Sequence, residues 1–291
     1  MKNIARLLLS LLATSALVCA ATIAQPSGLI ILKGQTKEYV NEIIQTPFVT
    51  VEAGGTLILR GTTLLVDGAS EGAGNVHVKP GGTMLILNGS NVTSANSYSY
   101  TFWVNETANF EMRDSGMSKC GRVGGPTDYH IRGMLIKADS AIIENTVFGD
   151  NHFCIIVSGA KNAGITKNTF NGCYRAITLN GTSSARIENN DFKTGEVGQY
   201  SLYLASSVDA LVSDNTFENP AGIGLLKTNS SIIRNNEFGD STGPSITLST
   251  ENHDSKENVL ENNTIAGRLK VQGVSNTING GSVGTELFIG T

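Results

Sequence analysis

The chain has little of what builds helical bundles, membrane spans or nucleic-acid surfaces. Only 16% of its 291 residues are charged and 6% are aromatic, with six Pro and four Cys, whereas Gly is abundant at 33. This composition is typical of a turn-rich all-β protein. The formal net charge of −4 and the pI of about 5.6 provide no basic surface for phosphate backbones, so we expect no nucleic-acid partner. No Cys/His cluster has the spacing of a metal site, and we expect neither metal nor cofactor.

The first residues have the features of an export signal. Lys2 and Arg6 precede an apolar run from Leu7 to Val18, which is followed by small residues up to Ala24. The run is shorter than the roughly 20 residues that span a bilayer as a helix. We therefore expect residues 1–24 to be a cleaved signal peptide, the mature chain to have no transmembrane segment, and the protein to be secreted to the cell surface.

Removal of this signal leaves an odd number of cysteines, namely Cys120, Cys154 and Cys173. An oxidising compartment favours disulfides, so at least one thiol must be free or bonded to another chain. The sequence leaves their pairing open.

A repeated phrase dominates the rest of the sequence: an aliphatic residue, two polar positions, Asn, a small or acidic residue, and an apolar residue. Successive copies are about 22 residues apart, as Phe170 and Phe192 are, and each is followed by an aliphatic-x-aliphatic run such as Ile177-Thr-Leu179. One such layer cannot bury its apolar face alone, whereas stacked layers close every backbone hydrogen bond and align like residues. The repeat therefore predicts a parallel β-helix. The clearest copies are Ile165–Phe170, Ile187–Phe192, Val212–Phe217, Ile233–Phe238 and Leu260–Ile265.

The Asn and Phe of each phrase are expected to be structural. A corner Asn tolerates the left-handed conformation, and its amide can bond the Asn of the next layer, so an internal column satisfies itself. The aromatic residues, as at Phe170 and Phe192, should form a stacked core ladder. We place Asn262 in the internal column, where no glycan could reach it.

These Ile-x-x-Asn-x-Phe units resemble the parallel β-helix repeats of the pectin-lyase-like superfamily, especially NosD-like and related extracellular right-handed β-helix proteins. The resemblance covers roughly residues 133–281 and implies an all-β, single-domain right-handed parallel β-helix. It is weak for activity, because that superfamily includes lyases, hydrolases, epimerases, adhesins and inert surface proteins.

The N-terminal third contains a second variant of the coil. Val49–Leu59 is echoed by Val76–Leu87, each with a Gly-Gly turn. We expect about ten coils within a β-helix domain spanning residues 47–291, preceded by a lead-in at residues 25–46. Within this lead-in, Thr36–Thr46 has the apolar spacing of a short amphipathic helix that would cap the N-terminal end.

The best candidate site lies where the repeat is interrupted. A Gly-rich insertion, Gly121–Pro126, is followed by alternating polar residues, and the next coils add two further polar pairs. His152 and Tyr174 are 22 residues apart, so they should stack as neighbours and line a small groove. The candidate catalytic residues are Asp128, His130, Arg132, Asp150, His152 and Arg175, with Tyr129 and Tyr174 as candidate binding residues.

The function stays open among three classes. The absence of the paired-Asp, Gly-His-Gly and Asp-Pro-His patterns of known polysaccharide enzymes, and a chain that ends almost where its coils end, favour a non-catalytic structural component of the envelope or extracellular matrix. Its partners would be further copies of itself or envelope components. The alternatives are a polysaccharide lyase, hydrolase or epimerase, with Ca²⁺ only in the case of a lyase, and a glycan-binding adhesin. The glycosylation candidates are Asn88, Asn91, Asn105, Asn180 and Asn229.

Overall fold

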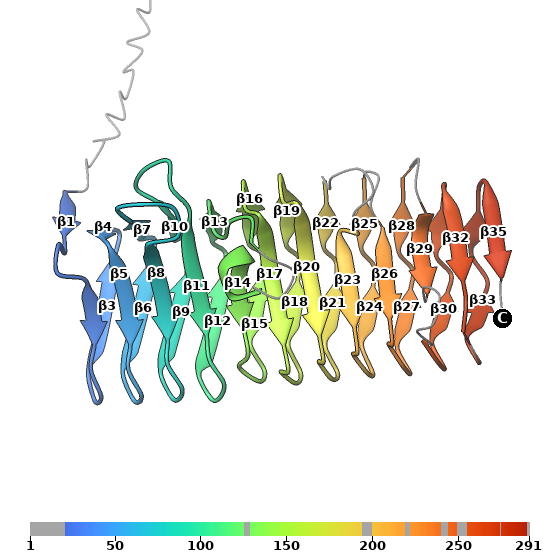
Figure 1. The fold of residues 1–291 in the computed structure, drawn as a ribbon, viewed down its shortest axis with the longest axis horizontal. Coiled ribbons are helices and arrows are strands. Elements are labelled where there is room, and N and C mark those ends of the chain that lie inside the picture. Colours follow the sequence, from blue (N-terminus) through green and yellow to red (C-terminus); the bar gives the residue numbers. More distant parts are fainter. Residues whose placement is uncertain are drawn as a thin grey trace, which may run out of the picture.

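A computed structural model describes residues 21–124, 129–193, 200–218, 222–239, 244–248, 255–273 and 275–289. The expected signal peptide and Asp128 thus lie mostly or wholly outside the described residues. The described chain winds through three parallel sheets, A, B and C, which contain 12, 12 and 11 strands. Figure 1 shows the coils stacked in sequence order along one axis. The predicted all-β parallel β-helix is confirmed.

Each coil runs through sheet B, then sheet C, then sheet A. Sheet A comprises β1 (Thr22–Ala24), β4 (Ile43–Thr46), β7 (Thr63–Val66), β10 (Asn91–Ser94), β13 (Gly116–Ser118), β16 (Val147–Gly149), β19 (Thr169–Asn171), β22 (Asp191–Phe192), β25 (Thr216–Phe217), β28 (Glu237–Phe238), β31 (Thr264–Ile265) and β34 (Ser282–Val283). Sheet B comprises β2 (Leu29–Ile31), β5 (Phe48–Val51), β8 (Gly74–Val78), β11 (Tyr100–Val104), β14 (Gly133–Ile136), β17 (Phe153–Ser158), β20 (Arg175–Asn180), β23 (Leu202–Ala205), β26 (Ile223–Leu226), β29 (Pro244–Leu248), β32 (Arg268–Val271) and β35 (Glu286–Ile289). Sheet C comprises β3 (Thr36–Val40), β6 (Thr56–Arg60), β9 (Thr83–Leu87), β12 (Asn109–Arg113), β15 (Ile142–Glu144), β18 (Gly164–Thr166), β21 (Arg186–Glu188), β24 (Leu211–Ser213), β27 (Ile232–Arg234), β30 (Val259–Glu261) and β33 (Thr277–Asn279).

The interior contains the two ladders that the repeat predicts. From Asn190 onwards, each ladder Asn accepts, at its side-chain oxygen, the backbone N–H and the side-chain amide of the Asn one coil earlier, as Asn190 does from Asn168 at 2.9 and 3.0 Å. The Phe rings stack from Phe148 through Phe170 to Phe238, with centroids 4.4–5.2 Å apart. Both structural predictions are therefore confirmed, since buried amides are paired and like side chains align.

The left-handed residue at this corner is not the ladder Asn itself. It is the preceding residue, for example Asn189 (φ 56°) before Asn190 and Asp214 (φ 58°) before Asn215. The same offset makes Asn262, rather than Asn263, the exposed left-handed residue. The expectation that Asn262 lies in the internal column is therefore wrong.

The predicted capping helix at Thr36–Thr46 is also wrong. These residues form β3 and β4, joined by a corner at Asn41 with a φ of 55°. The apolar spacing that imitates a helix face arises from two short strands on either side of a left-handed turn. The coils accordingly begin at Thr22 instead of residue 47, and the structure has about 12 of them rather than ten.

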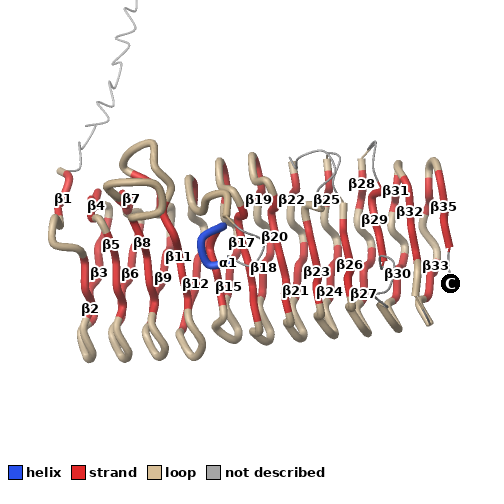
Figure 2. Tube along the Cα trace, viewed as in Figure 1, coloured by secondary structure: helices blue, strands red, loops and turns tan. Residues whose placement is uncertain are grey.

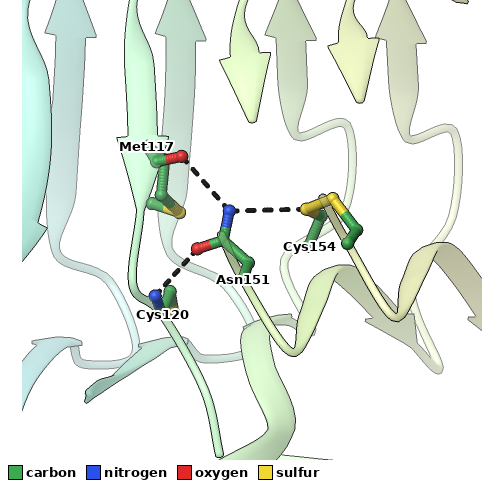
Figure 3. Close-up of a disulfide and its surroundings, with 5 residues drawn as sticks. Met117, Cys120, Asn151 and Cys154 are labelled. Carbon is green, nitrogen blue, oxygen red and sulfur yellow. Dashed lines mark hydrogen bonds between the residues drawn. A yellow bond between two sulfur atoms is a disulfide. The ribbon is translucent and has the colours of Figure 1, made fainter. Parts of the chain in front are cut away.

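Two of the three mature cysteines join adjacent coils. Cys154 and Cys173 form a disulfide with Cα atoms 5.9 Å apart, whereas Cys120 is a free, buried thiol. Figure 3 shows Asn151 between them: its oxygen accepts the N–H of Cys120, and its amide donates to Cys154 Sγ and to the Met117 carbonyl. A disulfide is typical of a protein outside the cytoplasm.

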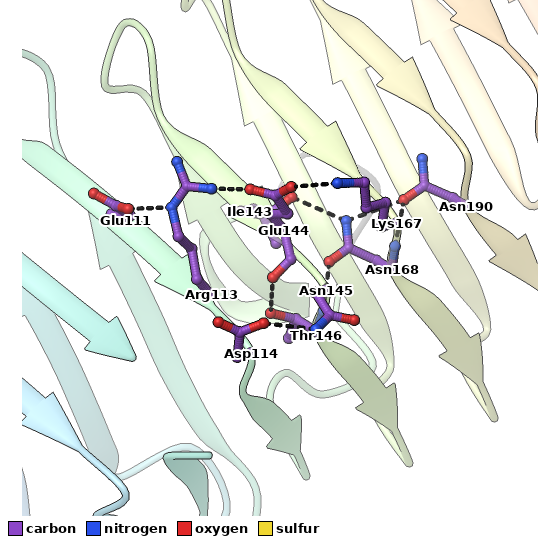
Figure 4. Close-up of polar contacts among 10 residues, drawn as sticks. All are labelled: Glu111, Arg113, Asp114, Ile143, Glu144, Asn145, Thr146, Lys167, Asn168 and Asn190. Atoms are coloured by element: carbon purple, nitrogen blue, oxygen red, sulfur yellow. Dashed lines mark hydrogen bonds and ion pairs between the residues drawn. The ribbon is translucent and has the colours of Figure 1, made fainter. Parts of the chain in front are cut away.

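Charged side chains pair across neighbouring coils on the outer face of sheet C. Figure 4 shows Arg113 between Glu111 and Glu144, and Glu144 also accepts from Lys167 Nζ at 3.0 Å. These ion pairs lie outside the core, and those of Glu144 join residues of successive coils as the ladders inside the core do. Within the described residues, no helix is long and apolar enough to cross a membrane.

Candidate functional site on the outer face of sheet B

Alternate residues of the sheet B strands point outward, because side chains along a strand alternate between its two faces. The middle residue of each aliphatic-x-aliphatic run therefore joins an outer ladder. In the strand register of this ladder, Trp103 pairs with His77 in the preceding coil and with Leu135 in the following one. Further along, Thr178 pairs with Tyr203. Two of these positions, Trp103 and Tyr203, have large aromatic rings.

A short helix follows the Gly-rich insertion and contacts two strands of sheet B. This helix is α1 (Tyr129–Arg132), which contacts β11 and β14 and appears beside β17 in Figure 2. Beneath it lies a second apolar cluster of Leu135, Phe153 and Ile156, against which Trp103 and Tyr174 pack. At the interruption of the repeat, the wall formed by sheet B thus carries this helix and this cluster on its outer side.

Two arginines converge on one aromatic ring in this wall. The guanidinium carbons of Arg132 and Arg175 lie 5.3 and 5.2 Å from the centroid of the Phe153 ring. Arg175 also lies 4.7 Å from the centroid of Tyr203, and Arg132 donates to the Gly124 carbonyl at 2.7 Å. Guanidinium groups stack favourably on aromatic faces, so both cations are held in defined positions.

His152 and Tyr174 stack as the 22-residue spacing predicts, with centroids 5.0 Å apart. Both rings also stack on Phe153, at 5.0 and 5.8 Å. We call Arg132, Phe153, Tyr174, Arg175 and Tyr203 the arginine–aromatic patch, with His152 at its edge. Thr178, beside Tyr203 in the ladder, has a buried hydroxyl without a hydrogen-bond partner in the described part of the chain.

The structure brings together only part of the predicted constellation. Asp150 is exposed at a left-handed corner (φ 53°), and its carboxylate makes no hydrogen bond or ion pair among the described residues. Asp128 lies outside the described residues. Tyr129 and His130 are in α1, but their side chains are outside the description. The paired carboxylates of acid/base chemistry are thus not assembled within the described residues.

The sequence interpretation missed three aromatic rings on this outer face, namely Trp103 beside the patch and Phe153 and Tyr203 within it. The sequence could have indicated the outward orientation of Trp103 and Tyr203, because they are the middle residues of Phe102-Trp-Val104 and Leu202-Tyr-Leu204. In the repeat pattern, that middle position must face outward.

A separate polar contact lies near the N-terminal end of this ladder. His77 stands edge-on to Trp103 with centroids 5.3 Å apart, and its Nε2 lies 3.0 Å from the Asn105 amide. Partial burial, followed by the positive charge of Lys79, lowers the pKa of His77 below its ordinary value.

The candidate glycosylation residues have different surroundings. Asn88 is exposed at a left-handed corner, and Asn91 and Asn180 are half-buried. The side chains of Asn105 and Asn229 already make hydrogen bonds, to His77 and to the Lys256 N–H. Asn88 is therefore the most accessible of the five, and its modification remains a prediction.

Comparisons with known proteins support the fold and its family. A family model described as "Right handed beta helix region" matches residues 153–285, and one described as "Periplasmic copper-binding protein (NosD)" matches residues 33–197. No curated protein matches the chain.

Solved structures with the same kind of fold are distant in sequence. The periplasmic alginate epimerase AlgG is 14% identical with a TM-score of 0.55, and the match covers 87% of this chain and 77% of that one. PfbA, a surface adhesin of Streptococcus pneumoniae, is 11% identical with a TM-score of 0.36, covering 85% of each chain. The Dettilon tailspike protein is 13% identical with a TM-score of 0.36, covering 79% of this chain and 45% of that one. At these identities the likeness concerns the fold alone.

Proposed function

The chain belongs to the NosD family of β-helix proteins, and from this premise we propose that it is an exported, non-catalytic protein that binds an acidic polysaccharide at the arginine–aromatic patch. The observation that carries the proposal is the convergence of Arg132 and Arg175 on the Phe153 ring. A guanidinium group matches a carboxylate through two parallel hydrogen bonds, and stacking on an aromatic face fixes the position of its charge.

The aromatic members of the patch supply the second requirement of sugar recognition. Tyr174 and Tyr203 are half-buried, so each presents part of an apolar ring together with a polar hydroxyl. A saccharide ring can pack on the apolar face while its carboxylate meets a guanidinium group. The fold neighbour that is named an alginate epimerase acts on an acidic polysaccharide, which agrees with this ligand class.

Binding to uronic-acid oligomers tests the proposal. Arg175→Gln should weaken binding of an oligogalacturonate at least tenfold, because a charge-assisted hydrogen bond is worth about 1.5–3 kcal/mol. Arg234→Gln is the matched control, since Arg234 is an exposed arginine on sheet C. Calorimetric titration should show no binding of neutral cello-oligomers. Equal binding by wild type and Arg175→Gln, or equal binding of neutral and acidic oligomers, would refute the proposal.

Catalysis at the same place is a second candidate, favoured by the position of His152. Its ring stacks on Tyr174, the residue next to Arg175. A base beside a group that neutralises a carboxylate is the arrangement needed to remove a proton next to that carboxylate. This candidate predicts epimerised or unsaturated uronates by NMR with the wild type and none with His152→Ala. Binding without any product in the wild type would eliminate it.

The self-assembling envelope component expected from the sequence can be tested with the same preparation. A structural role predicts large particles or fibres in light scattering, with and without reductant. A monodisperse monomer at high concentration would contradict that role and leave the polysaccharide proposal intact.

Copper does not fit the residues that the structure describes. They contain no group of three or more His, Cys, Asp or Glu side chains that could hold a metal ion. The thiols of these residues do not offer a thiolate ligand either, since Cys154 and Cys173 are joined and burial raises the pKa of Cys120 well above its ordinary value. The proposal therefore involves no metal.

A further inference from the structure

We infer that a second carboxylate-binding subsite lies in the pocket of Arg268, Leu269, Lys270, Glu286 and Phe288, and that one acidic polymer occupies this pocket and the arginine–aromatic patch together. The inference rests on the proposed function and adds a second binding site for the same polymer. We call this set of residues the β32–β35 pocket.

The pocket combines a cavity, two cations and an exposed ring. Its volume is about 260 Å³. Lys270 Nζ lies 5.8 Å from the centroid of Phe288, and Arg268 faces Glu286 at 3.2 Å. Phe288 is 47% exposed and points away from the core. An exposed ring beside two cations repeats, in a different coil, the chemistry of the arginine–aromatic patch.

The Arg268–Glu286 ion pair does not prevent ligand binding. Both side chains are more than half exposed, at 55% and 57%. Such a surface pair contributes little, about 0–1 kcal/mol. A carboxylate on the ligand can therefore compete with Glu286 for Arg268, while Lys270 supplies a second positive charge.

The two sites lie on one outer ladder of sheet B. The strand register pairs Tyr203 with Gly224, Gly224 with Thr247, and Thr247 with Lys270. Three strand steps of about 4.8 Å place Lys270 about 14 Å from Tyr203 along the stack. Because both sites follow the axis of the coils, a linear polymer that runs along this axis can reach both.

Between the sites, an aromatic ring covers Gly224, and Thr247, the next position of the ladder, is buried. Gly224 has no side chain, and a Cβ at this position would lie 2.5 Å from the Tyr200 ring, so that ring packs directly over the glycine. Tyr200 also stacks on Tyr203 with centroids 6.2 Å apart. Tyr200 thus extends the aromatic surface by one coil towards the β32–β35 pocket.

Two linked sites should make affinity depend on ligand length. Once one end of a polymer is bound at the patch, the pocket meets the other end at a high effective concentration. A disaccharide can occupy only one site, whereas an oligomer of roughly ten sugars can occupy both. Acidic oligomers should therefore bind more tightly as they grow, with a clear increase once they span the two sites.

The experiment compares digalacturonate with an oligogalacturonate of about ten sugars by calorimetric titration of the full chain. Lys270→Gln/Phe288→Ala should weaken the long oligomer roughly tenfold or more and leave the weak binding of the disaccharide at the patch unchanged. Lys270→Gln alone should act in the same direction with a smaller loss. Lys256→Gln is the matched control, because Lys256 is an exposed lysine at a corner outside sheet B.

The outcomes separate this inference from the proposed function. If Arg175→Gln weakens both ligands while the pocket variants change neither, the second subsite is refuted and the proposed function stands. If Arg175→Gln changes neither ligand, the proposed function itself is refuted. Equal weakening of the long oligomer by Lys256→Gln and Lys270→Gln would also refute the subsite, because the effect would then come from net charge alone.

Discussion

Each ladder Asn satisfies backbone groups of a neighbouring coil as well as its own amide. Asn190 accepts the backbone N–H and side-chain amide of Asn168, and donates to the Ile165 carbonyl and to Asn215. A buried donor left unpaired costs about 1–3 kcal/mol. We expect Asn190→Ala to lower the free energy of unfolding by roughly 2–5 kcal/mol in urea titrations, because the backbone N–H of Asn168 and one of its two side-chain N–H groups lose their acceptor.

The matched control for the ladder variant is Asn171→Ala. Asn171 is exposed at the end of β19, and its side chain makes no hydrogen bond among the described residues. This change should alter stability by less than about 0.5 kcal/mol. Similar losses in both variants would mean that the ladder adds nothing beyond an ordinary polar residue.

His77 gives the outer ladder a pH dependence of known sign. Partial burial and Lys79 lower its pKa in the folded state, while Glu52 and Asn105 oppose this shift. The unfolded chain, with an ordinary pKa of 6.5, therefore takes up the proton first as pH falls. Above that pH both states are neutral and the group contributes nothing. Stability should fall between pH 7.5 and 5.5 by more in the wild type than in His77→Gln, as measured by urea midpoints; equal slopes would contradict the prediction.

At the scale of strands and corners, the sequence predicts those contacts that follow from the period of the repeat. The stacking of His152 on Tyr174 follows from their spacing, because equivalent positions in successive coils must be neighbours. The prediction of a helix at Thr36–Thr46 is wrong because two strands joined by a corner at Asn41 have the same apolar spacing as one helical turn. The convergence of Arg132 on Phe153 could not be predicted, since it depends on the path of a non-repeating insertion.

The disulfide joins two adjacent coils, at the start of β17 and just before β20. It links Cys154 and Cys173 across a sequence separation of 19, which restricts the unfolded chain. A loop of this size corresponds to about 3 kcal/mol. We expect Cys154→Ser/Cys173→Ser to lower the free energy of unfolding by about 2–4 kcal/mol. Reductant should destabilise the wild type and have no effect on the double variant; a reductant effect of equal size in both would contradict a role for this bond.

For the whole molecule, the stack behaves as a one-dimensional array in which each coil contacts mainly its neighbours. The strongest contacts between elements join strands of adjacent coils, as in β17 with β20 and β14 with β17. Stability is then close to a sum of coil and interface contributions. The arginine–aromatic patch and the β32–β35 pocket lie in different coils, so loss of one need not disturb the other.

Removal of the last coil tests this independence directly. A chain that ends at Gly267 lacks β32–β35 but keeps every strand that carries the patch. It should retain its β-sheet circular dichroism, and the urea m-value should fall by roughly a tenth, because m scales with the surface exposed on unfolding. The shortened chain should also bind digalacturonate like the full chain and lose the length-dependent gain. Complete unfolding would instead show that the coils form one cooperative unit, whose ends cannot be removed without loss of the site.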